Sequence, residues 1–475
     1  MQRTQYDAVI VGAGPNGLAA AVTIAQQGRS VVIFEAADTI GGGTRTAELT
    51  LPGFKHDVCS AIHPLGLASP FFRALPLDRY GLKWIQPNAA LAHPLDDGTA
   101  VLLSRDMQTT VDGLGSDGAA YQRLLSPFIE NWQALLYEIL GPLRPPRHPF
   151  LMARFGLLAL RSARGLASAR FKREQTRALF AGLGAHSMMP LDTMLTSAFG
   201  IMLGSLAHAV GWPMAAGGSQ SIPAALADYL DSMGVEIITG RRIQNLDELP
   251  QAKAVLLNTA PNQLSQIAGG QLPDRYLKRL KRYRYGPGVF KVDWALDGPI
   301  PWTALQCMEA GTVHVGGTMD EIVGAEGAVG RGDHSEQPFI ILAQQSLFDS
   351  SRAPEGKHTA WGYCHVPNGS GVDMTDRIEV QIERFAPGFR DRILARHTRN
   401  SVEMEAYNPN YVGGDINAGL QDLRQIFTRP LPRLSPYTTP LKDLYLCSSS
   451  TPPGGGVHGM CGYHAARVAL KRSLR

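Results

Sequence analysis

Apolar and polar positions follow strand and helix periods over the first part of the chain. Tyr6–Val11 is a continuous apolar, β-branched run of strand length. From Leu18 onward the pattern is that of a helix, which ends at Gly28, and Ser30–Phe34 is a second buried-strand pattern. The order strand, helix, strand predicts a βαβ unit, and therefore an α/β fold with a parallel sheet.

The turn between the first strand and the helix carries glycines at the spacing of a dinucleotide-binding fingerprint. Gly12, Gly14 and Gly17 fit the pattern GxGxxG, and Glu35 follows the second strand. The first glycine permits a tight turn, the second lets a pyrophosphate approach the backbone, and the third lets the helix pack on the strand. Because a helix N-terminus attracts phosphate and a carboxylate accepts ribose hydroxyls, the unit predicts a dinucleotide site.

Residues 112–118 read DGLGSDG and match the same glycine pattern, but we expect no second site there. The segment follows a polar stretch and not a buried strand, and two aspartates would face the phosphates. We interpret it as a turn before a helix over Ala119–Leu140, capped by Ser116 or Asp117. The sequence therefore contains no convincing separate NAD(P)H domain.

Two further segments favour FAD over NAD as the dinucleotide. Gly41–Gly43 form a second glycine cluster that precedes Arg45, and such a loop can fold back against the same pyrophosphate. Near the other end, Leu441–Cys447 predicts a short strand, which leads through a glycine-rich turn into a helix from about Tyr463. A helix N-terminus can point at the electron-rich edge of a flavin.

These motifs resemble those of the FAD-dependent phytoene-dehydrogenase-related oxidoreductases, a branch of the amine-oxidase and carotenoid-desaturase superfamily. The matching segments are GAGPNGLAAA with FEA, PGFKHDVCSAIHPL, GWPMAAGGSQSIPAALADYL, YGPGVFKVDWAL and PPGGGVHGMCGYHAA, spread over essentially the whole chain. The resemblance is greatest to the subgroup with phytoene-dehydrogenase homologues and pyridine nucleotide-disulfide oxidoreductase domain-containing proteins. Two positions depart from the superfamily pattern: Gly43 stands where arginine is usual, and Ser448 or Ser449 where glycine is usual.

The resemblance implies an α/β fold with a Rossmann-type FAD-binding domain and a discontinuous α+β substrate domain. The FAD domain would comprise residues 1–70, 215–275 and 430–475, and the substrate domain residues 71–214 and 276–429. It implies FAD as the cofactor and no metal. The expected cofactor-binding residues are Gly12, Gly14, Pro15, Asn16, Gly17, Glu35, Ala36, Gly42, Gly43, Thr44, Arg45, Ile243, Val457, Gly459 and Met460.

The resemblance also implies an oxidoreductase that desaturates, saturates or isomerises an apolar, polyene or lipid-like substrate by hydride transfer at the flavin. His458 would lie at the flavin ring and accept a proton, or would only fill the turn. His63, His464 and Tyr463 are weaker candidates. Two other functions stay open: a flavin amine oxidase, which calls for an aromatic cage, and a flavin-stabilised binding protein without turnover.

Composition narrows the location and the partners. The net charge of +4, with 18% charged residues, gives no reason to expect a nucleic-acid partner. Five scattered cysteines without a CxxC pair predict reduced thiols in a cytoplasmic protein. The first strand begins too early for a secretory signal, and the apolar stretches are too short to span a bilayer.

Residues 144–177 are strongly basic, with nine Lys or Arg and a single acid, Glu174. Arg147, Arg154 and Arg161 recur every seven residues beside apolar side chains. The pattern predicts either a basic amphipathic helix on an anionic membrane surface, at its inner face, or a solvated helix of the substrate domain. The sequence leaves the oligomeric state open.

Overall fold

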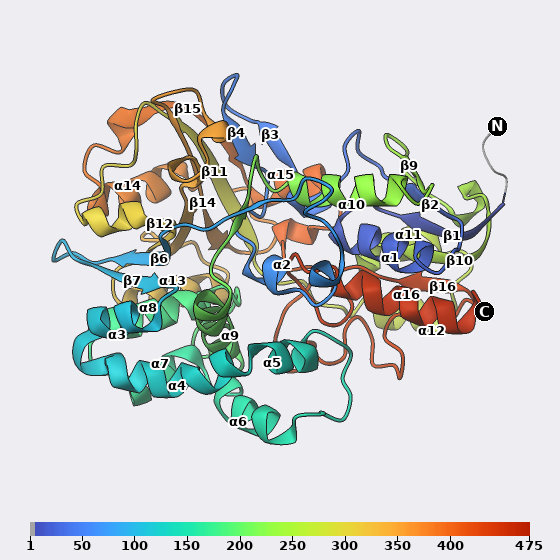
Figure 1. Cartoon of the computed structure of the whole chain (residues 1–475), viewed down its shortest axis with the longest axis horizontal. Helices are drawn as coiled ribbons and strands as arrows, with labels where there is room; N and C mark the ends of the chain where they lie inside the picture. The colour runs from blue at the N-terminus through green and yellow to red at the C-terminus, as the bar shows by residue number, and fades with distance from the viewer. Residues whose placement is uncertain (1–4) are drawn as a thin grey trace.

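The computed structural model of the protein describes residues 5–475 and contains two large sheets, each with helices on both faces (Figure 1). One sheet is parallel, with the strand order β16-β10-β1-β2-β9. Its strands are β1 (Gln5–Val11), β2 (Val31–Phe34), β9 (Glu236–Ile238), β10 (Gln251–Leu257) and β16 (Leu444–Leu446). This sheet confirms the predicted βαβ unit and the Rossmann-type α/β fold.

Alternate residues of β1 face opposite layers of helices, as expected for a strand buried on both sides. Ala8 and Ile10 pack against α1 (Pro15–Ala25), α10 (Ser221–Asp231) and α16 (Met460–Arg472). Val9 and Val11 pack towards α11 (Pro261–Ile267) and α12 (Asp274–Leu280).

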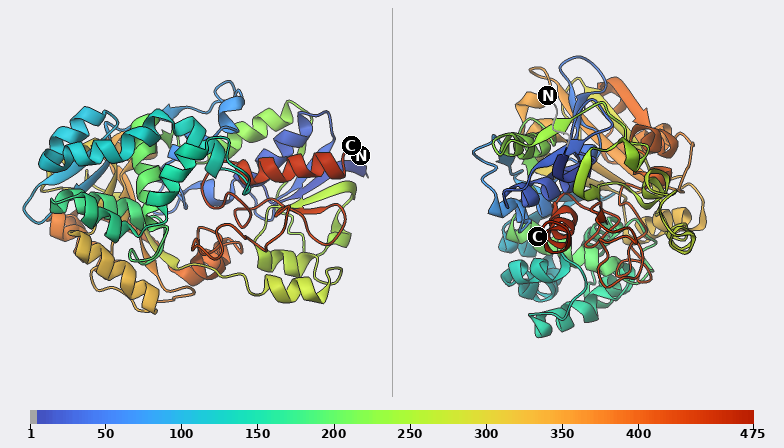
Figure 2. Two further views of the ribbon diagram at one scale, coloured as in Figure 1. Left: turned by 90° about the horizontal axis from the view of Figure 1, so that it is seen from below. Right: turned by 90° about the vertical axis from the view of Figure 1, so that its right-hand side faces the viewer.

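Helices from the two ends of the chain cross at very short range. Helices α1 and α16 lie side by side (Figure 2). A Cβ added at Gly462 of α16 would stand 1.7 Å from the Asn16 carbonyl oxygen of α1. Only glycine permits this approach.

The other sheet is mixed, with the order β15-β11-β14-β13-β12-β6-β7; only β6 and β12 pair in parallel. One face is covered by α14 (Thr375–Phe385) and the other by a layer of eight helices. The strands are β6 (Ala89–Pro94), β7 (Ala100–Ser104), β11 (Gly288–Leu296), β12 (Ala310–Val315), β13 (Ile340–Ala343), β14 (His358–Val366) and β15 (Ile393–Arg399). The helical layer comprises α3 (Met107–Leu114), α4 (Gly118–Glu130), α5 (Trp132–Ile139), α6 (Pro149–Ala159), α7 (Ala163–Arg170), α8 (Glu174–Ala185), α9 (Thr196–Ala209) and α13 (Met319–Arg331).

Smaller elements connect the two sheets. They are the pairs β3 (Thr46–Glu48) with β4 (Lys55–Asp57) and β5 (Trp84–Ile85) with β8 (Met214–Ala215), and the helices α2 (Pro64–Ala68) and α15 (Ser401–Tyr407). Asp57 and Arg352 form a fully buried ion pair of 2.8 Å, and the same carboxylate accepts a hydrogen bond from the Ser219 amide before α10. The residue boundaries of the two domains stay a prediction.

Three predictions of local structure are wrong. The helix over Ala119–Leu140 is two helices, α4 and α5, because Asn131 leaves the helical conformation and its amide donates to the Pro127 carbonyl. Asp117 precedes α4 but does not cap it, since its carboxylate accepts hydrogen bonds from the Lys172 and Arg173 amides. The segment VEIITGRRIQNL predicts a strand, a turn and a second strand, but only the first strand, β9, forms, and the chain around Ile243 is irregular.

The basic stretch 144–177 is not one helix. It spans α6, α7 and the start of α8, because the Ser162 side chain accepts from the Gly165 amide and begins a new helix there. Arg147, Arg154 and Arg161 therefore do not share one helix face. Within residues 5–475, no helix is long and apolar enough to cross a bilayer.

Candidate active site

A cavity of about 590 Å³ lies between the two large sheets. It begins at the carboxyl ends of β1, β2 and β10, where Gly12, Glu35 and Asn258 follow the strands. Ligands of parallel α/β sheets bind at this edge. We call the loops after these strands and after β16 the loop wall. The residues from α8, α9, the α9–β8 turn and β12–β14 form the sheet wall: His186, Leu203, Trp212, Thr312, Ile341, Ala343, Trp361 and Tyr363.

The first glycine turn has the geometry that the fingerprint requires. Gly12 has φ +100°, a conformation that favours glycine. A Cβ at Gly17 would stand 1.9 Å from the Gly12 carbonyl oxygen. Helix α1 begins after Gly14 with no side-chain cap and no acid in its first turn. Its free N–H groups therefore form an anion-binding end at the cavity.

Glu35 is held in a fixed position at the end of β2. It is 8% exposed, and one of its oxygens accepts from the Ala13 amide at 2.7 Å. The other oxygen accepts from the Ala37 amide at 3.0 Å and from Arg45 Nη2 at 3.1 Å. Since a carboxylate accepts about four hydrogen bonds, one position remains for a ligand hydroxyl.

Arg45 lines the cavity, but its guanidinium is engaged within the protein. Besides Glu35, it donates to the Thr39 carbonyl at 2.8 Å and lies 5.6 Å from the centre of the Tyr407 ring. The residue is 7% exposed. It therefore fixes Glu35. The sequence predicted that Arg45 contacts a pyrophosphate, and that contact stays a prediction.

The second glycine cluster packs directly on the first. The Gly41 amide donates to the Ala13 carbonyl at 2.9 Å, and a Cβ at Gly42 would stand 3.2 Å from the Gly14 Cα. A Cβ at Gly43 would stand 2.4 Å from the Tyr411 hydroxyl oxygen. Tyr411 thus occupies the space that a side chain at position 43 would need.

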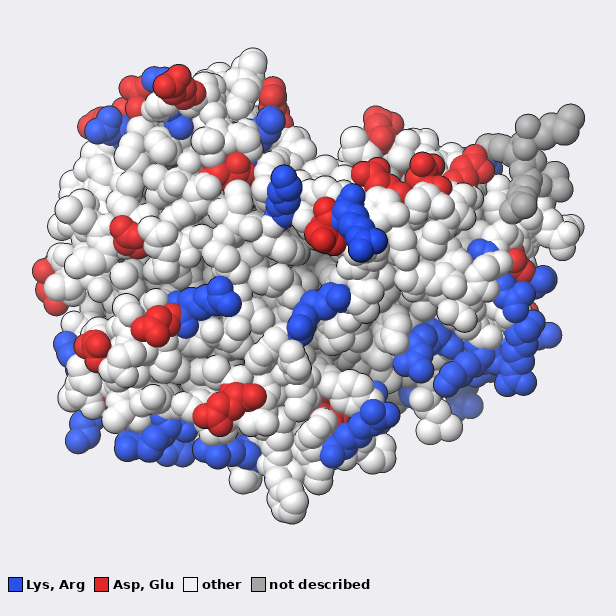
Figure 3. Space-filling view, viewed as in Figure 1, with Lys and Arg blue, Asp and Glu red and all other residues white. Residues whose placement is uncertain are grey.

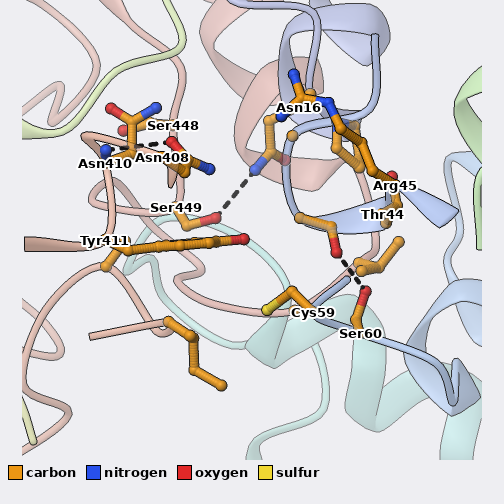
Figure 4. A pocket seen from close by; sticks show the side chains of 18 of the residues that line it. Asn16, Thr44, Arg45, Cys59, Ser60, Asn408, Asn410, Tyr411, Ser448 and Ser449 are labelled. Carbon is orange, nitrogen blue, oxygen red and sulfur yellow. Dashed lines mark hydrogen bonds between the residues drawn. The ribbon is translucent and has the colours of Figure 1, made fainter. Parts of the chain in front are cut away.

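Tyr411 and Cys59 line the cavity and lie close to each other (Figure 4). Burial raises the pKa of the Tyr411 hydroxyl and of the Cys59 thiol, so both stay protonated at neutral pH. Nearby, the Asn16 amide donates to Ser449 Oγ at 3.2 Å (Figure 4). The Asn16 side-chain oxygen is buried and has no partner among the described residues.

The sheet wall is apolar and aromatic. The rings of Trp361 and Tyr363 stack with centres 5.6 Å apart and planes at 27°. The Trp212 indole donates to Thr312 Oγ1 at 3.0 Å, so neither polar group is left unpaired. Apart from Glu35, no Asp or Glu of residues 5–475 lines the cavity.

His186 is the histidine of the sheet wall. Its Nε2 lies 2.9 Å from Nε2 of the fully buried His314, so one ring donates to the other. Burial lowers the pKa of His186 to about 3. The ring is therefore neutral at physiological pH.

Comparison with known proteins agrees with this geometry. Residues 10–75 match the NAD(P)-binding Rossmann-like domain family. Pyridine nucleotide-disulfide oxidoreductase domain-containing protein 2 of Mus musculus is 27% identical over 99% of this chain and 94% of the relative. The neurosporene-forming phytoene desaturase of Rhodobacter capsulatus is 24% identical over 96% of this chain and 92% of the relative.

Solved structures share the whole architecture. An oxidoreductase from Methanosarcina mazei has a TM-score of 0.67 at 16% identity, covering 98% of this chain and 99% of its own. Putrescine oxidase has a TM-score of 0.62 at 19% identity, covering 99% of both chains. These homologues and the shared fold fit the superfamily of FAD-dependent amine oxidases and carotenoid desaturases.

The loop wall fits FAD. The uncapped N-terminus of α1 and the two packed glycine turns form a cradle for a diphosphate, and Glu35 faces the cavity with one free acceptor position. The unpartnered oxygen of Asn16 is a further acceptor beside the cradle. The cavity volume lies within the range of about 300–1,000 Å³ for cofactor and ligand pockets.

Most of the residues expected at the cofactor line the cavity. They are Gly12, Gly14, Pro15, Asn16, Glu35, Ala36, Gly42, Gly43, Thr44, Arg45, Ile243 and Val457. Gly17, Gly459 and Met460 are not in its wall. Gly17 permits helix packing. Gly459 has φ +69° and precedes α16, and a Cβ added at Gly459 would stand 2.9 Å from the Phe72 ring.

His458 does not line the cavity. Its ring is fully buried, and Nδ1 accepts a hydrogen bond from the Met460 amide at 3.0 Å, at the start of α16. Burial lowers the pKa of His458 to about 4. This position favours the structural alternative, a histidine that fills the turn, over the proton acceptor.

Of the other three candidate catalytic residues, one lines the cavity and two do not. His63 lines the cavity, with Nε2 2.8 Å from Ser219 Oγ. His464 lies near the Leu140 carbonyl, and Tyr463 packs on Phe71; neither lines the cavity.

Sequence reasoning missed the residues of the sheet wall and the segment 407–418, which includes Tyr407 and Tyr411. Each lies far from the glycine motifs along the chain, and no short motif marks them. The alternating apolar pattern of β14 was the available signal, since it places Trp361 and Tyr363 on one face.

Proposed function

We propose that the chain is an FAD-dependent oxidoreductase that desaturates, saturates or isomerises an apolar, polyene or lipid-like substrate. The observation that supports this most directly is the chemistry of the sheet wall. Leu203, Ile341, Ala343 and the Trp361–Tyr363 pair present apolar and aromatic surface to the same cavity as the loop wall. A polyene is flat and apolar, so it gains by burial against such a surface.

Bound FAD would supply hydride chemistry in this cavity. The chain's own residues bind and orient. Glu35, fixed by Arg45, accepts from the ribose, and the uncapped α1 N-terminus neutralises phosphate charge. The sheet wall excludes water and holds the substrate against the cofactor.

His186, the histidine of the sheet wall, offers a hydrogen-bonding group to a polar end of the substrate. Its Nε2 is taken by His314, and its Nδ1 has no hydrogen-bond partner among residues 5–475. Because the ring is neutral, it acts as a hydrogen-bonding group and not as a fixed charge.

The relatives support the same substrate class. Two that match most of the chain are named for phytoene: the Rhodobacter capsulatus desaturase and the phytoene dehydrogenase of Streptomyces griseus, the latter 25% identical over 83% of this chain.

Amine oxidation is the second candidate. The aromatic side chains Trp212, Trp361 and Tyr363 favour it, since aromatic faces attract cations. The sheet wall offers no carboxylate among the described residues to pair with an ammonium group. An apolar substrate therefore suits the wall better.

The test starts from the purified protein with its cofactor. Organic extraction should recover an isoprenoid or other lipid, and acid precipitation should release FAD, since none of the buried cysteines beside the C-terminal turn reaches the cavity. Under anaerobic conditions, the extracted lipid should change the oxidation state of the bound flavin. Bleaching by primary amines but not by lipid would favour the amine oxidase. No response to either would favour a binding protein without turnover.

A further inference from the structure

Helix α6 lies at the lower edge of the helical layer and exposes apolar side chains (Figure 1). Its inner residues Phe155 and Ala159 are buried in the core of this layer. On its outer face, Phe150 is 90% and Leu157 77% exposed. Leu143, in the preceding loop, is 78% exposed.

A surface helix normally keeps its outer face polar. A helix that is apolar all round is typical of a buried position, and α6, in which Arg154 is the one charged residue, is covered on one side only. Phe150 and Leu157 stand seven residues apart, so they lie on the same side of the helix. Their exposure indicates an interaction surface.

Basic side chains accompany this apolar face. Arg154 lies between Phe150 and Leu157, four residues after one and three before the other. Neither Arg147 nor Arg154 forms an ion pair within the described part of the chain. Glu174, the one acid of residues 144–177, forms no ion pair with either arginine, and its carboxylate accepts a hydrogen bond from the Met319 amide.

The charge distribution extends this pattern. Figure 3 shows Lys and Arg along much of the lower edge of the molecule, where α6 lies in Figure 1, whereas Asp and Glu are more frequent along the upper edge. The surface around α6 therefore has a positive potential of its own.

We propose that the α6 surface, defined as Leu143, Arg147, Phe150, Arg154 and Leu157, docks on an anionic lipid bilayer. The apolar side chains enter the boundary between headgroups and acyl chains, and the two guanidinium groups contact lipid phosphates. The membrane contact predicted from the sequence thus rests on α6 and its leading loop and not on one long helix.

A second copy of the chain fits this surface less well. In a two-fold dimer the same surface of each copy faces the other, so the arginines of one copy would meet a surface that carries no acid. An anionic membrane satisfies the apolar and the basic side chains together.

Docking at this surface brings the bilayer close to the cavity. Helix α6 packs on α9, and Leu203 of α9 lines the sheet wall. One helix therefore separates the docked face from the cavity. The inference does not depend on the proposed reaction, because lipid binding is measurable without a substrate.

The experiment is vesicle flotation of the full chain with its FAD. Wild-type protein should float with vesicles of phosphatidylcholine and phosphatidylglycerol, and much less with phosphatidylcholine alone. Phe150→Ser with Leu157→Ser, and Arg147→Glu with Arg154→Glu, should each weaken binding by about tenfold or more. Binding should also weaken as the salt concentration is raised, because salt shortens the Debye length from about 10 Å to about 3 Å.

The control is Leu305→Ser, which removes an apolar side chain that is 75% exposed and lies outside the α6 surface. It should float like wild type, and every variant should keep its FAD. Absence of flotation at low salt, equal flotation with both vesicle types, or an equal loss in the control would overturn the proposal. So would a wild-type dimer that Phe150→Ser with Leu157→Ser dissociates, because a second copy would then cover α6.

Discussion

The two walls of the cavity are built by different means. The loop wall consists of glycines, backbone N–H groups and one buried ion pair, Glu35 with Arg45, and two of its turns are within the first 45 residues. The sheet wall consists of large side chains from α8, α9 and β12–β14. Backbone geometry thus defines the cofactor end, whereas interchangeable side chains define the substrate end. We expect substitutions in the two walls to separate cofactor binding from substrate use.

The largest effect is expected at Gly17. In Gly17→Ala the new methyl group meets the Gly12 carbonyl oxygen at 1.9 Å, and both partners are backbone, so α1 must move away from β1. The purified variant should contain no bound FAD by absorbance, or should fail to fold.

The second GxGxxG segment provides the matched control. Gly113→Ala adds a methyl group that meets nothing within 4 Å. Its FAD content should equal that of wild type. Loss of FAD in this variant would contradict the prediction that residues 112–118 form no dinucleotide site.

Glu35→Gln should weaken FAD binding while leaving the sheet wall intact. The variant loses a charged acceptor for the ribose, which corresponds to a fall in affinity of about tenfold to a hundredfold. It also leaves Arg45 buried without its counter-charge, so the apoprotein should unfold at lower temperature. FAD titration and thermal unfolding measure both effects.

Glu48→Gln is the control for this variant, because Glu48 is exposed on β3. Wild-type FAD retention in Glu35→Gln would show that Glu35 is not the ribose ligand. A loss of equal size in Glu48→Gln would show that the assay reports general damage.

Trp361→Ala should show the converse behaviour. The FAD content should stay at the wild-type level, since Trp361 belongs to the sheet wall. Flavin reduction by an apolar substrate should slow by about tenfold, because one stacked ring is lost. Trp361→Phe keeps an aromatic ring and should recover most of the rate in stopped-flow traces. A large loss of FAD in Trp361→Ala would contradict the division into two walls.

Acid pH should lower the stability of the whole fold and not of one wall. Among these predictions, it has the smallest effect per residue. Burial lowers the pKa of His63 to about 4, and it does the same for His93 and His458. The unfolded chain takes up protons near pH 6.5 but the folded chain does not, so stability is lost as pH falls from about 6.5 to about 4.

At one pH unit below its ordinary pKa, each of these histidines lowers the free energy of unfolding by about 1 kcal/mol. The melting temperature should therefore fall steadily from pH 7 to pH 5. Replacement of His93 by Gln should flatten this slope, and an unchanged slope would contradict its neutral burial.

Prediction from the sequence was successful where a short contiguous segment determines the structure. The βαβ unit and its glycine turns depend on local backbone conformation, and both could be read from spacing. Glu35 was recognised as a cavity residue, but its pairing with Arg45 was not, since both were assigned to the ligand. The mutual fit of Gly43 and Tyr411 depends on residues far apart along the chain.

The predicted ends of helices were wrong for a related reason. Apolar periodicity continues through Asn131 and across Ser162, whereas the breaks depend on side-chain hydrogen bonds to the backbone. His458 shows the same limit at the site. Its place in a glycine-rich turn suggested chemistry, but the direction of its ring is set by the Met460 amide.

The contact between Gly462 and Asn16 has a consequence for how the protein is made. The strand and helix of the glycine fingerprint leave the ribosome long before α16, which must lie against them. Ser448, Ser449 and Val457, which complete the loop wall, are also synthesised late, just before α16. A nascent chain that stops before α16 therefore lacks a finished flavin pocket. Retention of the yellow colour would then report that translation has passed α16.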